Sequence, residues 1–279
     1  MKGNARTPLA DLSIADASPV AAAIAVQDAL TLTMVEEALE KRRLRLAFQP
    51  VVMGNDPSRV GFYEGLIRVL DDTGRAIPAR DFMGAIETTE IGRLIDCASL
   101  EIGLATLAQQ PGIRVAVNMS ARSVGYPRWM RILRRALSHH PDIGHRLILE
   151  ITESSAMLVP ELVIAFMDDL QSSGVAFALD DFGSGYTSFR YLRDFFFDII
   201  KIDGEFTRGI ARNPDNQVLT RALLSVGKHF DMLTVAESVE TPEDAAFLQG
   251  EGIGCMQGFL FGAPTVRPVW AERTQRRSA

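Results

Sequence analysis

Short apolar runs alternate with longer amphipathic segments along most of this chain. The apolar runs have the length of strands, and they are Leu44–Val52, Val60–Leu70, Arg114–Ser120, Arg146–Glu153, Val175–Asp181, Asp198–Asp203, Leu233–Glu240 and Cys255–Gly262. The segments between them have helix-like spacing, and they are Ala79–Gln109, Ser123–Ser138, Ser155–Ser173, Thr187–Arg193, Glu205–Phe230 and Pro242–Gln249. Such alternation predicts a parallel sheet, and eight strands predict its closure into a barrel.

The first connection departs from this pattern. Met53–Arg59, which contains Gly54 and Pro57, is too short for a crossover between parallel strands. We therefore expect the first two strands to form an antiparallel hairpin. The predicted fold class is α/β, a TIM-like (β/α)8 barrel with its first strand antiparallel.

Composition narrows the class of protein. The chain has 279 residues, 47% of them hydrophobic, which is enough for one large core. Its net charge of -6 disfavours a nucleic-acid polymer as a partner. The two cysteines, Cys97 and Cys255, lie in apolar stretches without paired spacing, so we interpret them as reduced core residues of a cytoplasmic protein.

The two ends of the chain are predicted to lie outside the domain. Residues 1–30 are rich in Ala, Ser, Asp and Pro and are interpreted as a flexible leader. Their apolar stretch is too short to span a bilayer, so membrane insertion is not expected. Thr33–Glu36 has capping-box spacing and predicts the start of a short helix. The domain is predicted over 31–266, followed by a basic tail over 267–279.

Polar residues follow the strand-like runs. They are Glu64, Asn118, Glu150 with Glu153, Asp180 with Asp181, Lys201, Glu237 with Glu240, and Gln257. The chemistry of such barrels lies at the carboxyl ends of the parallel strands, so these side chains are expected to share one pocket. Taken singly, each could be a helix cap or a surface charge, and the adjacent acids Asp180-Asp181 could be a solvated turn. Two adjacent carboxylates are more readily accommodated beside a divalent cation, and Lys201 between isoleucines requires anionic neighbours if it is buried.

The motifs at these positions resemble those of the EAL-domain phosphodiesterases. They are Phe48-Gln49-Pro50, Tyr63-Glu64-Gly65-Leu66-Ile67-Arg68, Val117-Asn118-Met119-Ser120, Glu150-Ile151-Thr152-Glu153, Asp180-Asp181-Phe182-Gly183-Ser184-Gly185-Tyr186, Lys201-Ile202-Asp203, Val235-Ala236-Glu237-Ser238-Val239-Glu240 and Gln257-Gly258. The resemblance runs from about Leu44 to Pro264. It implies a cyclic-guanylate-specific phosphodiesterase that hydrolyses the bacterial second messenger cyclic di-GMP to linear pGpG.

The resemblance also implies a set of metal ligands. Glu64, Asn118, Glu150 and Asp180 would bind a first ion, and Asp180 would bridge to a second ion held by Asp181, with Glu237 beside it. Mg²⁺ or Mn²⁺ is expected because the ligands are oxygens, and inhibition by Ca²⁺ is expected.

Other positions acquire roles only through the resemblance. Lys201 and Glu237 would act on the attacking water, together with the ligands Glu64 and Asp181. The implied substrate contacts are Gln49, Arg68 and Gln257. Glu153 would anchor the loop Phe182–Ser188, which resembles the segment next to the family's dimer contact, so a homodimer is expected. A regulatory protein partner is a further possibility, because no sensory module is visible in the sequence.

Some positions depart from the family pattern. The first motif has Gly65 in place of Ala, Val69–Asp72 replaces a Trp and a His-Pro, and Gly204 replaces an Arg. Two other function classes stay open: a non-catalytic cyclic di-GMP receptor that acts through a protein partner, and an unrelated Mg²⁺-dependent barrel enzyme such as an enolase-like lyase.

Overall fold

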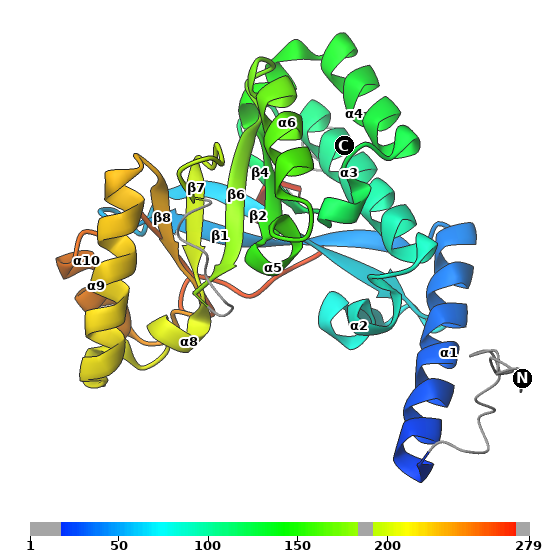
Figure 1. Cartoon of the computed structure of the whole chain (residues 1–279), viewed down its shortest axis with the longest axis horizontal. Helices are drawn as coiled ribbons and strands as arrows, with labels where there is room; N and C mark the ends of the chain where they lie inside the picture. Colours follow the sequence, from blue (N-terminus) through cyan, green and yellow to red (C-terminus); the bar gives the residue numbers. More distant parts are fainter. Residues whose placement is uncertain (1–17, 184–191, 272–279) are drawn as a thin grey trace, which may run out of the picture.

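Eight strands close into a barrel in the computed structural model of the chain, which describes residues 18–183 and 192–271 (Figure 1). The strands are β1 Leu44–Met53, β2 Val60–Leu70, β4 Val115–Asn118, β5 Leu147–Thr152, β6 Ala176–Phe182, β7 Ile199–Ile202, β8 Leu233–Ala236 and β9 Cys255–Gln257. They are hydrogen-bonded in the order β1-β9-β8-β7-β6-β5-β4-β2, and the pairing of β1 with β2 closes the ring. The predicted barrel is confirmed.

Strand β1 runs against both of its neighbours. It pairs antiparallel with β2 and with β9, whereas the pairs from β2–β4 round to β8–β9 are parallel. The antiparallel hairpin predicted from the short first connection is therefore confirmed. A further short strand, β3 (Ala76–Pro78), pairs antiparallel with β2 outside the ring and was not predicted.

Helices flank the outside of the barrel (Figure 1). The longer ones are α3 Glu90–Gln109, α4 Pro127–His139, α6 Pro160–Gln171, α9 Pro214–His229 and α10 Pro242–Gly250. The shorter ones are η2 Ala79–Asp81, α2 Met83–Ile86, η3 Ala121–Ser123, η4 Pro141–Arg146, α5 Glu153–Ala156, α8 Gly204–Thr207 and η5 Ile210–Arg212.

Three of the predicted helices are interrupted. The segment Glu205–Phe230 contains α9 and the shorter α8 and η5, because Gly209 adopts a left-handed φ of 68° and Pro214 starts a new helix capped by Asn213. The segments Ala79–Gln109 and Ser155–Ser173 are divided in the same way into shorter helices. The predicted helix Thr187–Arg193 lies largely outside the described residues.

Helix α1 corrects the prediction for the N-terminal region. It spans Pro19–Glu40, and the Ser18 hydroxyl caps it by accepting a hydrogen bond from the Ala21 backbone amide. The predicted flexible leader is thus wrong for Pro19–Leu30. The predicted cap residue Thr33 lies inside the helix, where its hydroxyl donates to the Ala29 carbonyl. Proline in the first turn and alanine after it favour this earlier start.

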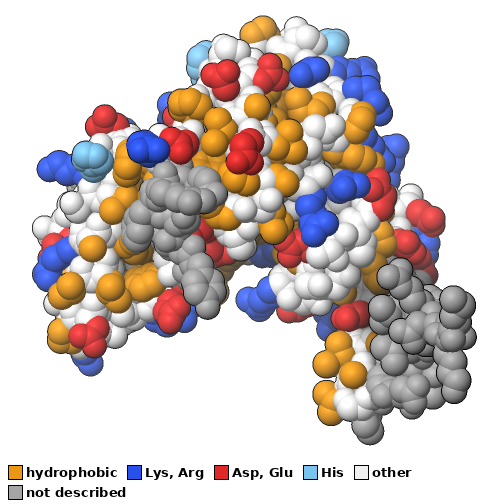
Figure 2. All heavy atoms as spheres, in the orientation of Figure 1, with side chains coloured by type: hydrophobic (Ala, Val, Ile, Leu, Met, Phe, Trp, Pro, Cys, Tyr) orange, Lys and Arg blue, Asp and Glu red, His pale blue; other side chains and the backbone are white. Residues whose placement is uncertain are grey.

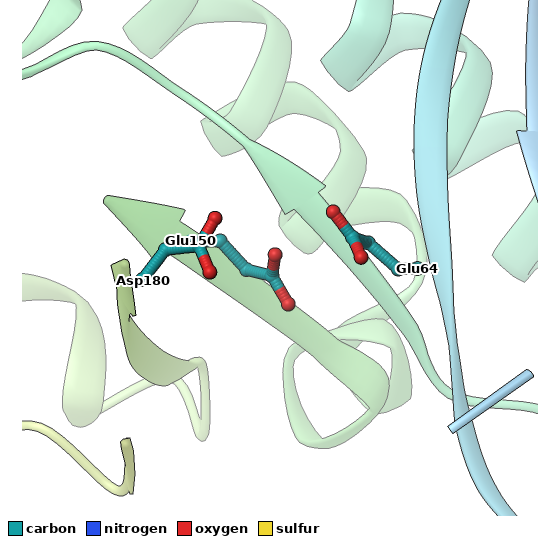
Figure 3. A group of neighbouring side chains, drawn as sticks. All are labelled: Glu64, Glu150 and Asp180. Carbon is teal, nitrogen blue, oxygen red and sulfur yellow. The ribbon is translucent and has the colours of Figure 1, made fainter. Parts of the chain in front are cut away.

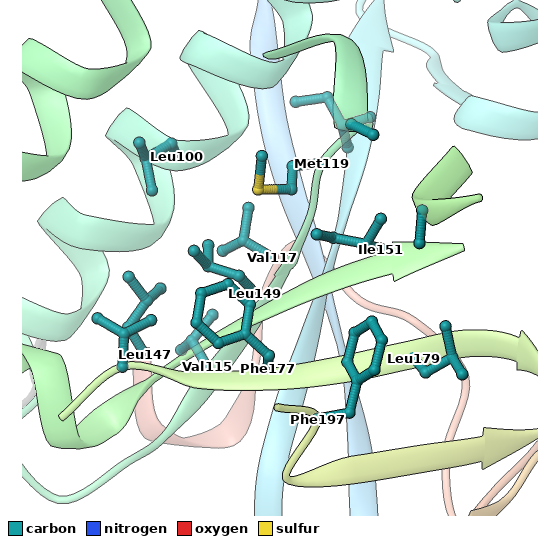
Figure 4. Packing of buried hydrophobic residues seen from close by; sticks show 14 of the residues in the cluster. Leu100, Val115, Val117, Met119, Leu147, Leu149, Ile151, Phe177, Leu179 and Phe197 are labelled. Atoms are coloured by element: carbon teal, nitrogen blue, oxygen red, sulfur yellow. The ribbon is translucent and has the colours of Figure 1, made fainter. Parts of the chain in front are cut away.

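The main core lies between the outer faces of the strands and the helices (Figure 4). Alternate residues of β4, β5 and β6, such as Val117, Leu149 and Phe177, are almost wholly buried there against α3 residues such as Leu100. A second, smaller apolar cluster fills the inside of the barrel. Both cysteines are buried and unpaired, as the sequence predicted. Among the described helices, none combines the length and the apolar character needed to cross a membrane.

Candidate functional site

The inside of the barrel has two layers. The apolar floor consists of Val51, Phe62, Ala116, Ile148, Ala178, Ile199, Val235 and Cys255. The polar layer consists of Gln49, Glu64, Asn118, Glu150, Asp180, Lys201, Glu237 and Gln257. On each parallel strand, the polar residue comes two positions after the floor residue and therefore lies nearer the carboxyl end. On the reversed β1, the polar residue Gln49 comes two positions before the floor residue Val51. Because side chains alternate between the faces of a strand, both layers point inward.

Lys201 occupies the centre of the polar layer. Its Nζ lies 3.5 Å from Glu64, 3.0 Å from Glu150, 2.8 Å from Asp180 and 2.7 Å from Glu237. The lysine is 1% exposed. Burial lowers the pKa of its ammonium group, but the four carboxylates outweigh burial and hold that pKa well above its usual range. The ammonium group therefore stays charged inside the barrel, as expected from the sequence.

Side-chain amides hold the Glu64 carboxylate. Asn118 Nδ2 donates to Glu64 Oε1 at 2.8 Å, and Gln257 Nε2 donates to Oε2 at 2.5 Å. Gln257 also donates to Gln49 Oε1, whose own amide donates to the Gly262 carbonyl. Burial raises the pKa of Glu64, but Lys201 and these amides outweigh it, so the pKa lies below its usual value. Glu64 is held ionised and in one orientation.

Glu150 and Glu237 are in the opposite electrostatic situation. Burial raises the pKa of each well above its usual value, Lys201 lowers it only in part, and neighbouring carboxylates raise it further. The Oε1 atom of Glu150 is buried and accepts no hydrogen bond from any residue that the structure describes. Figure 3 shows Glu64, Glu150 and Asp180 on three strands of the barrel, β2, β5 and β6, close to one another. The layer therefore has a surplus of carboxylate over cation and an unused buried oxygen.

Asp181 joins this cluster through a break in β6. Consecutive strand residues normally point to opposite faces, but the ladder to β7 is interrupted after Leu179, and Asp181 adopts a left-handed φ of 56°. Carboxylate atoms of Asp180, Asp181 and Glu237 consequently lie within 4.8 Å of one another, as do those of Glu64, Glu150 and Asp180. Burial and the charges of Asp180 and Asp203 raise the pKa of Asp181 to about 6. Two groups of oxygen ligands sharing Asp180 fit hard divalent cations.

Two cavities adjoin the polar layer and share Glu64, Asp180 and Asp181 in their walls. One, of about 320 Å³, is lined by Glu64, Asn118 and Asp181 and by apolar residues such as Met83. The other, of about 550 Å³, is lined by Lys201 and Glu237 and, farther out, by the residues of its mouth, Arg80, Arg208 and Phe259. A larger cavity at the start of β8 contains no residue of the polar layer. The two smaller cavities are therefore the candidate binding site.

The three mouth residues were not predicted from the sequence. Phe259 is 63% exposed. Gly258 before it packs on the loop that follows β8, where a Cβ would lie 1.9 Å from the Val239 carbonyl oxygen, so only glycine fits there. Arg80 lies in η2 and Arg208 directly follows α8, and both are exposed cations. The signal in the sequence that could have indicated this mouth is the phenylalanine directly after the Gln257-Gly258 motif.

The remaining predicted residues have more varied positions. Arg68 lies in β2, lines neither cavity, and donates to the Ile67 carbonyl, so its substrate contact stays a prediction. Glu153 is buried and accepts a hydrogen bond from the Gly183 amide at 3.1 Å. This bond holds the start of the loop predicted to contact a second subunit, but residues 184–191 lie outside the described part of the chain. Glu240 is exposed and lies 3.8 Å from Arg208.

Comparisons with known proteins agree with this geometry. The EAL domain family matches residues 33–264. The Pseudomonas aeruginosa protein MucR, a bifunctional diguanylate cyclase/cyclic di-GMP phosphodiesterase, is 32% identical over 237 residues, which are 82% of this chain and 34% of that protein. The Escherichia coli cyclic di-GMP phosphodiesterase PdeR is 31% identical over 236 residues, 83% of this chain and 35% of that protein. The chain thus spans about a third of the length of these relatives.

Solved structures give the same result. The phosphodiesterase PaMucR, solved as a c-di-GMP complex, is 31% identical with a TM-score of 0.73, covering 85% of this chain and 97% of that one. An EAL domain protein of Listeria monocytogenes is 25% identical with a TM-score of 0.75, covering 88% and 97%. The match to the EAL domain family covers most of the sequence, and the overall fold is shared with these structures. The chain therefore belongs to the EAL domain family.

Proposed function

We propose that the chain is a metal-dependent phosphodiesterase that hydrolyses cyclic di-GMP to linear pGpG. The observation that carries this proposal is the complete polar layer: every predicted metal ligand lies in this layer or, for Asp181, beside it, and the carboxylates of the layer outnumber its one cation. A buried Glu150 oxygen that accepts no hydrogen bond within the described part of the chain supports the presence of a cation at this position. The named activities of relatives at about 30% identity support the substrate.

The ligand groups divide the layer into two sites. Glu64, Asn118, Glu150 and Asp180 would hold one Mg²⁺ or Mn²⁺ ion, and Asp180, Asp181 and Glu237 would hold the other. Such ions, when bound, lower the pKa of a coordinated water and neutralise phosphoryl oxygens.

The other steps are performed by side chains of the chain itself. The attacking water forms a bond to phosphorus while the bond from phosphorus to the ribose 3′ oxygen breaks. That oxygen keeps the bonding electrons and takes a proton from solvent water, which gives the free hydroxyl of pGpG. A Glu237 carboxylate oxygen accepts the proton of the attacking water. The Lys201 ammonium, 2.7 Å from Glu237, neutralises charge that develops on the phosphoryl oxygens.

The cavities fit a molecule with two bases and two phosphates. Arg80 and Arg208 present guanidinium groups suited to phosphate. Phe259 presents an open aromatic face at the mouth, and a purine stacked on such a face gains about 1–3 kcal/mol. Gln49 and Gln257 lie at the inner end of the same cavity. A cytoplasmic location, a homodimer and a regulatory protein partner belong to the proposal as expectations from the family.

The test is a product assay on the purified chain. Cyclic di-GMP is incubated with Mg²⁺, Mn²⁺, Ca²⁺ or EDTA, and linear pGpG is separated by chromatography. Product with Mg²⁺ or Mn²⁺, but not with Ca²⁺ or EDTA, supports the proposal. Glu64→Ala should lose activity, while Glu205→Ala, an exposed glutamate outside the site, should keep it. Tight binding of cyclic di-GMP without product under either metal would show a receptor instead.

A further inference from the structure

Helix α8 consists of one turn, Gly204–Thr207, and follows strand β7. That strand lies between β6 and β8 in the barrel. The surface is hollowed between α8 and α2 (Figure 2), and the mouth residues Arg208 and Arg80 line the larger of the two candidate cavities there. Helix α8 therefore lies beside the candidate site, next to the strand ends that supply Asp181 and Glu237.

The hydroxyl of Thr207 contacts the turn that carries Glu237. Thr207 is wholly buried, and its Oγ1 donates a hydrogen bond to the Glu237 carbonyl oxygen. The Glu237 amide donates to the Ile202 carbonyl at 3.2 Å. Because β8 ends at Ala236, the Thr207 hydroxyl supplies the donor that a neighbouring strand would otherwise provide. The backbone of Glu237 is therefore held from both β7 and α8.

A second contact holds the residue after Glu237. Ser238 has a left-handed φ of 53°, which is uncommon for serine. Its side chain lies over Gly204, where a Cβ would be 2.4 Å from the serine Oγ and 2.7 Å from its Cβ. Gly204 thus leaves room for this turn. Gly204 and Thr207 are three residues apart on one helix face, so the same face of α8 contacts both residues of the turn.

Helix α8 is itself fixed to the rest of the protein. The Asp203 carboxylate caps it by accepting a hydrogen bond from the Glu205 amide at 2.6 Å. The Asn216 side chain of α9 donates to the Glu205 carbonyl at 2.8 Å. The buried Asp244 of α10 accepts a hydrogen bond at 3.2 Å from the amide of Gly209, two residues after α8. The helix can therefore hold the turn after β8 in one position.

The position of the Glu237 carboxylate matters to its neighbours in the polar layer. Its Oε1 lies 2.7 Å from the Lys201 Nζ, and one of its oxygens lies within 4.8 Å of carboxylate atoms of Asp180 and Asp181. Residues that orient a metal ligand commonly change metal affinity or activity by about tenfold to a hundredfold when they are replaced. A misplacement of about 1 Å at a reacting group has an effect of similar size.

We propose that α8 positions Glu237, with Thr207 as the positioning residue and Gly204 as the residue that makes room for the turn. The inference rests on the proposed function, in which Glu237 accepts the proton of the attacking water. Thr207 and Gly204 are both buried and face the turn, so they act through Glu237 rather than on the substrate.

Thr207→Val tests the hydrogen bond, because valine has nearly the shape of threonine without the hydroxyl. In the product assay with Mg²⁺, kcat should fall by about tenfold to a hundredfold, while KM should change by less than about threefold. Thr207→Ser keeps the donor and should stay within about threefold of the wild-type kcat.

The matched control is Thr220→Val. It removes an equally buried hydroxyl that makes only a 3.4 Å hydrogen bond to the Phe206 carbonyl, and it should keep the wild-type kcat. Circular dichroism and Tm of each variant check the fold. A lower Tm in Thr207→Val and Thr220→Val alike, with kcat unchanged in both, would show a merely structural role for Thr207.

A double-mutant cycle tests the second contact. Gly204→Ala puts a Cβ into the Ser238 side chain and should lower kcat by about tenfold. When Ser238→Gly is also present, the colliding atoms are absent and glycine suits the left-handed backbone, so Gly204→Ala should then change kcat by less than about threefold. Equal losses of kcat in the two backgrounds would overturn the role of Gly204.

Mn²⁺ binding separates this inference from the proposed function. Electron paramagnetic resonance measures free Mn²⁺ during a titration of each protein and requires no turnover. Thr207→Val should weaken one class of Mn²⁺ site by about tenfold or more, whereas Thr207→Ser and Thr220→Val should bind like the wild type. A wild type that forms no pGpG but shows this difference would refute the proposed function and support the positioning role. Equal kcat and equal Mn²⁺ affinity in the wild type and Thr207→Val would overturn the inference.

Discussion

Replacing Lys201 by methionine removes the only cation of the polar layer at nearly constant volume. Four carboxylates, with oxygens 2.7–3.5 Å from the Lys201 Nζ in the wild type, then lose the positive charge that neutralises them. A unit charge pair at about 3 Å is worth roughly 5 kcal/mol at an effective dielectric constant near 20. Removing one partner of a buried pair costs about 3–5 kcal/mol. We expect a loss of that size from the free energy of unfolding, lowering Tm by about 10 °C.

The pH dependence of this loss identifies its cause. The pKa values of Glu150 and Glu237 are already above their usual range with Lys201 present, and without it they should rise further. A carboxyl group with a raised folded-state pKa destabilises the fold above that pKa, and the penalty disappears as the pH falls toward the unfolded-state value. In EDTA, the gap between wild type and Lys201→Met should therefore be large at about pH 8 and small at about pH 5.

Thermal and urea unfolding at both pH values measure this gap. Mn²⁺ should stabilise Lys201→Met more than the wild type, because a cation that competes for the same carboxylates has been removed. The control is Lys228→Met on the exposed surface of α9, which should change stability by less than about 0.5 kcal/mol. A loss of equal size at both pH values, with no response to Mn²⁺, would refute the electrostatic reasoning and indicate a packing defect.

Four further substitutions give separate predictions. Glu64→Ala should abolish hydrolysis while the circular dichroism spectrum stays unchanged, and metal-dependent activity in this variant would show that Glu64 is not a ligand. Asp181→Asn should lower turnover by about two to four orders of magnitude and affinity for cyclic di-GMP by less than about tenfold. Asparagine tolerates the left-handed backbone at this position, so the fold should be kept. Equal losses in the product assay and in calorimetric titration would mean that Asp181 is not a ligand of the second ion. Burial raises the pKa of Asp96 to about 7, so the wild type should lose up to about 4 kcal/mol of stability as the pH rises from about 4 to 8. The variant Asp96→Asn should lose much less over the same range. Parallel pH profiles of the two proteins in urea unfolding would contradict this. Phe259→Ala should raise KM for cyclic di-GMP by about five- to a hundredfold with little change in kcat, whereas Leu260→Ala should match the wild type, and an unchanged KM would exclude base stacking.

The barrel and its polar layer could be predicted because both follow from spacing along the chain. The six residues between β1 and β2 are too few for a parallel crossover, so the two strands form a hairpin. The two-residue step from floor to polar layer follows from strand alternation. The resemblance to the EAL family then attached roles to positions such as Lys201. None of this required knowledge of which helix packs where.

The structural features that the sequence did not predict depend on contacts between residues distant in sequence or on the backbone angles of single residues. The close approach of Gly258, next to Phe259, to Val239 is not indicated by any local pattern. The turn of Asp181 into the site depends on one left-handed residue. The start of α1 was misplaced because a capping-box pattern at Thr33 was given more weight than the Ser18-Pro19 start.

The reversed first strand also has a consequence for the order in which the barrel forms. The β1–β2 ladder runs from Leu44 opposite Val69 to Val52 opposite Val60, so its partners are close in sequence. The β1–β9 ladder joins Met53 to Cys255, near opposite ends of the domain, through a much shorter stretch. Local pairing costs less loop entropy than distant pairing, so the hairpin is expected to form early and ring closure to be the late, slow step. Pulsed hydrogen exchange during refolding should protect the amides of β2 before those of β9.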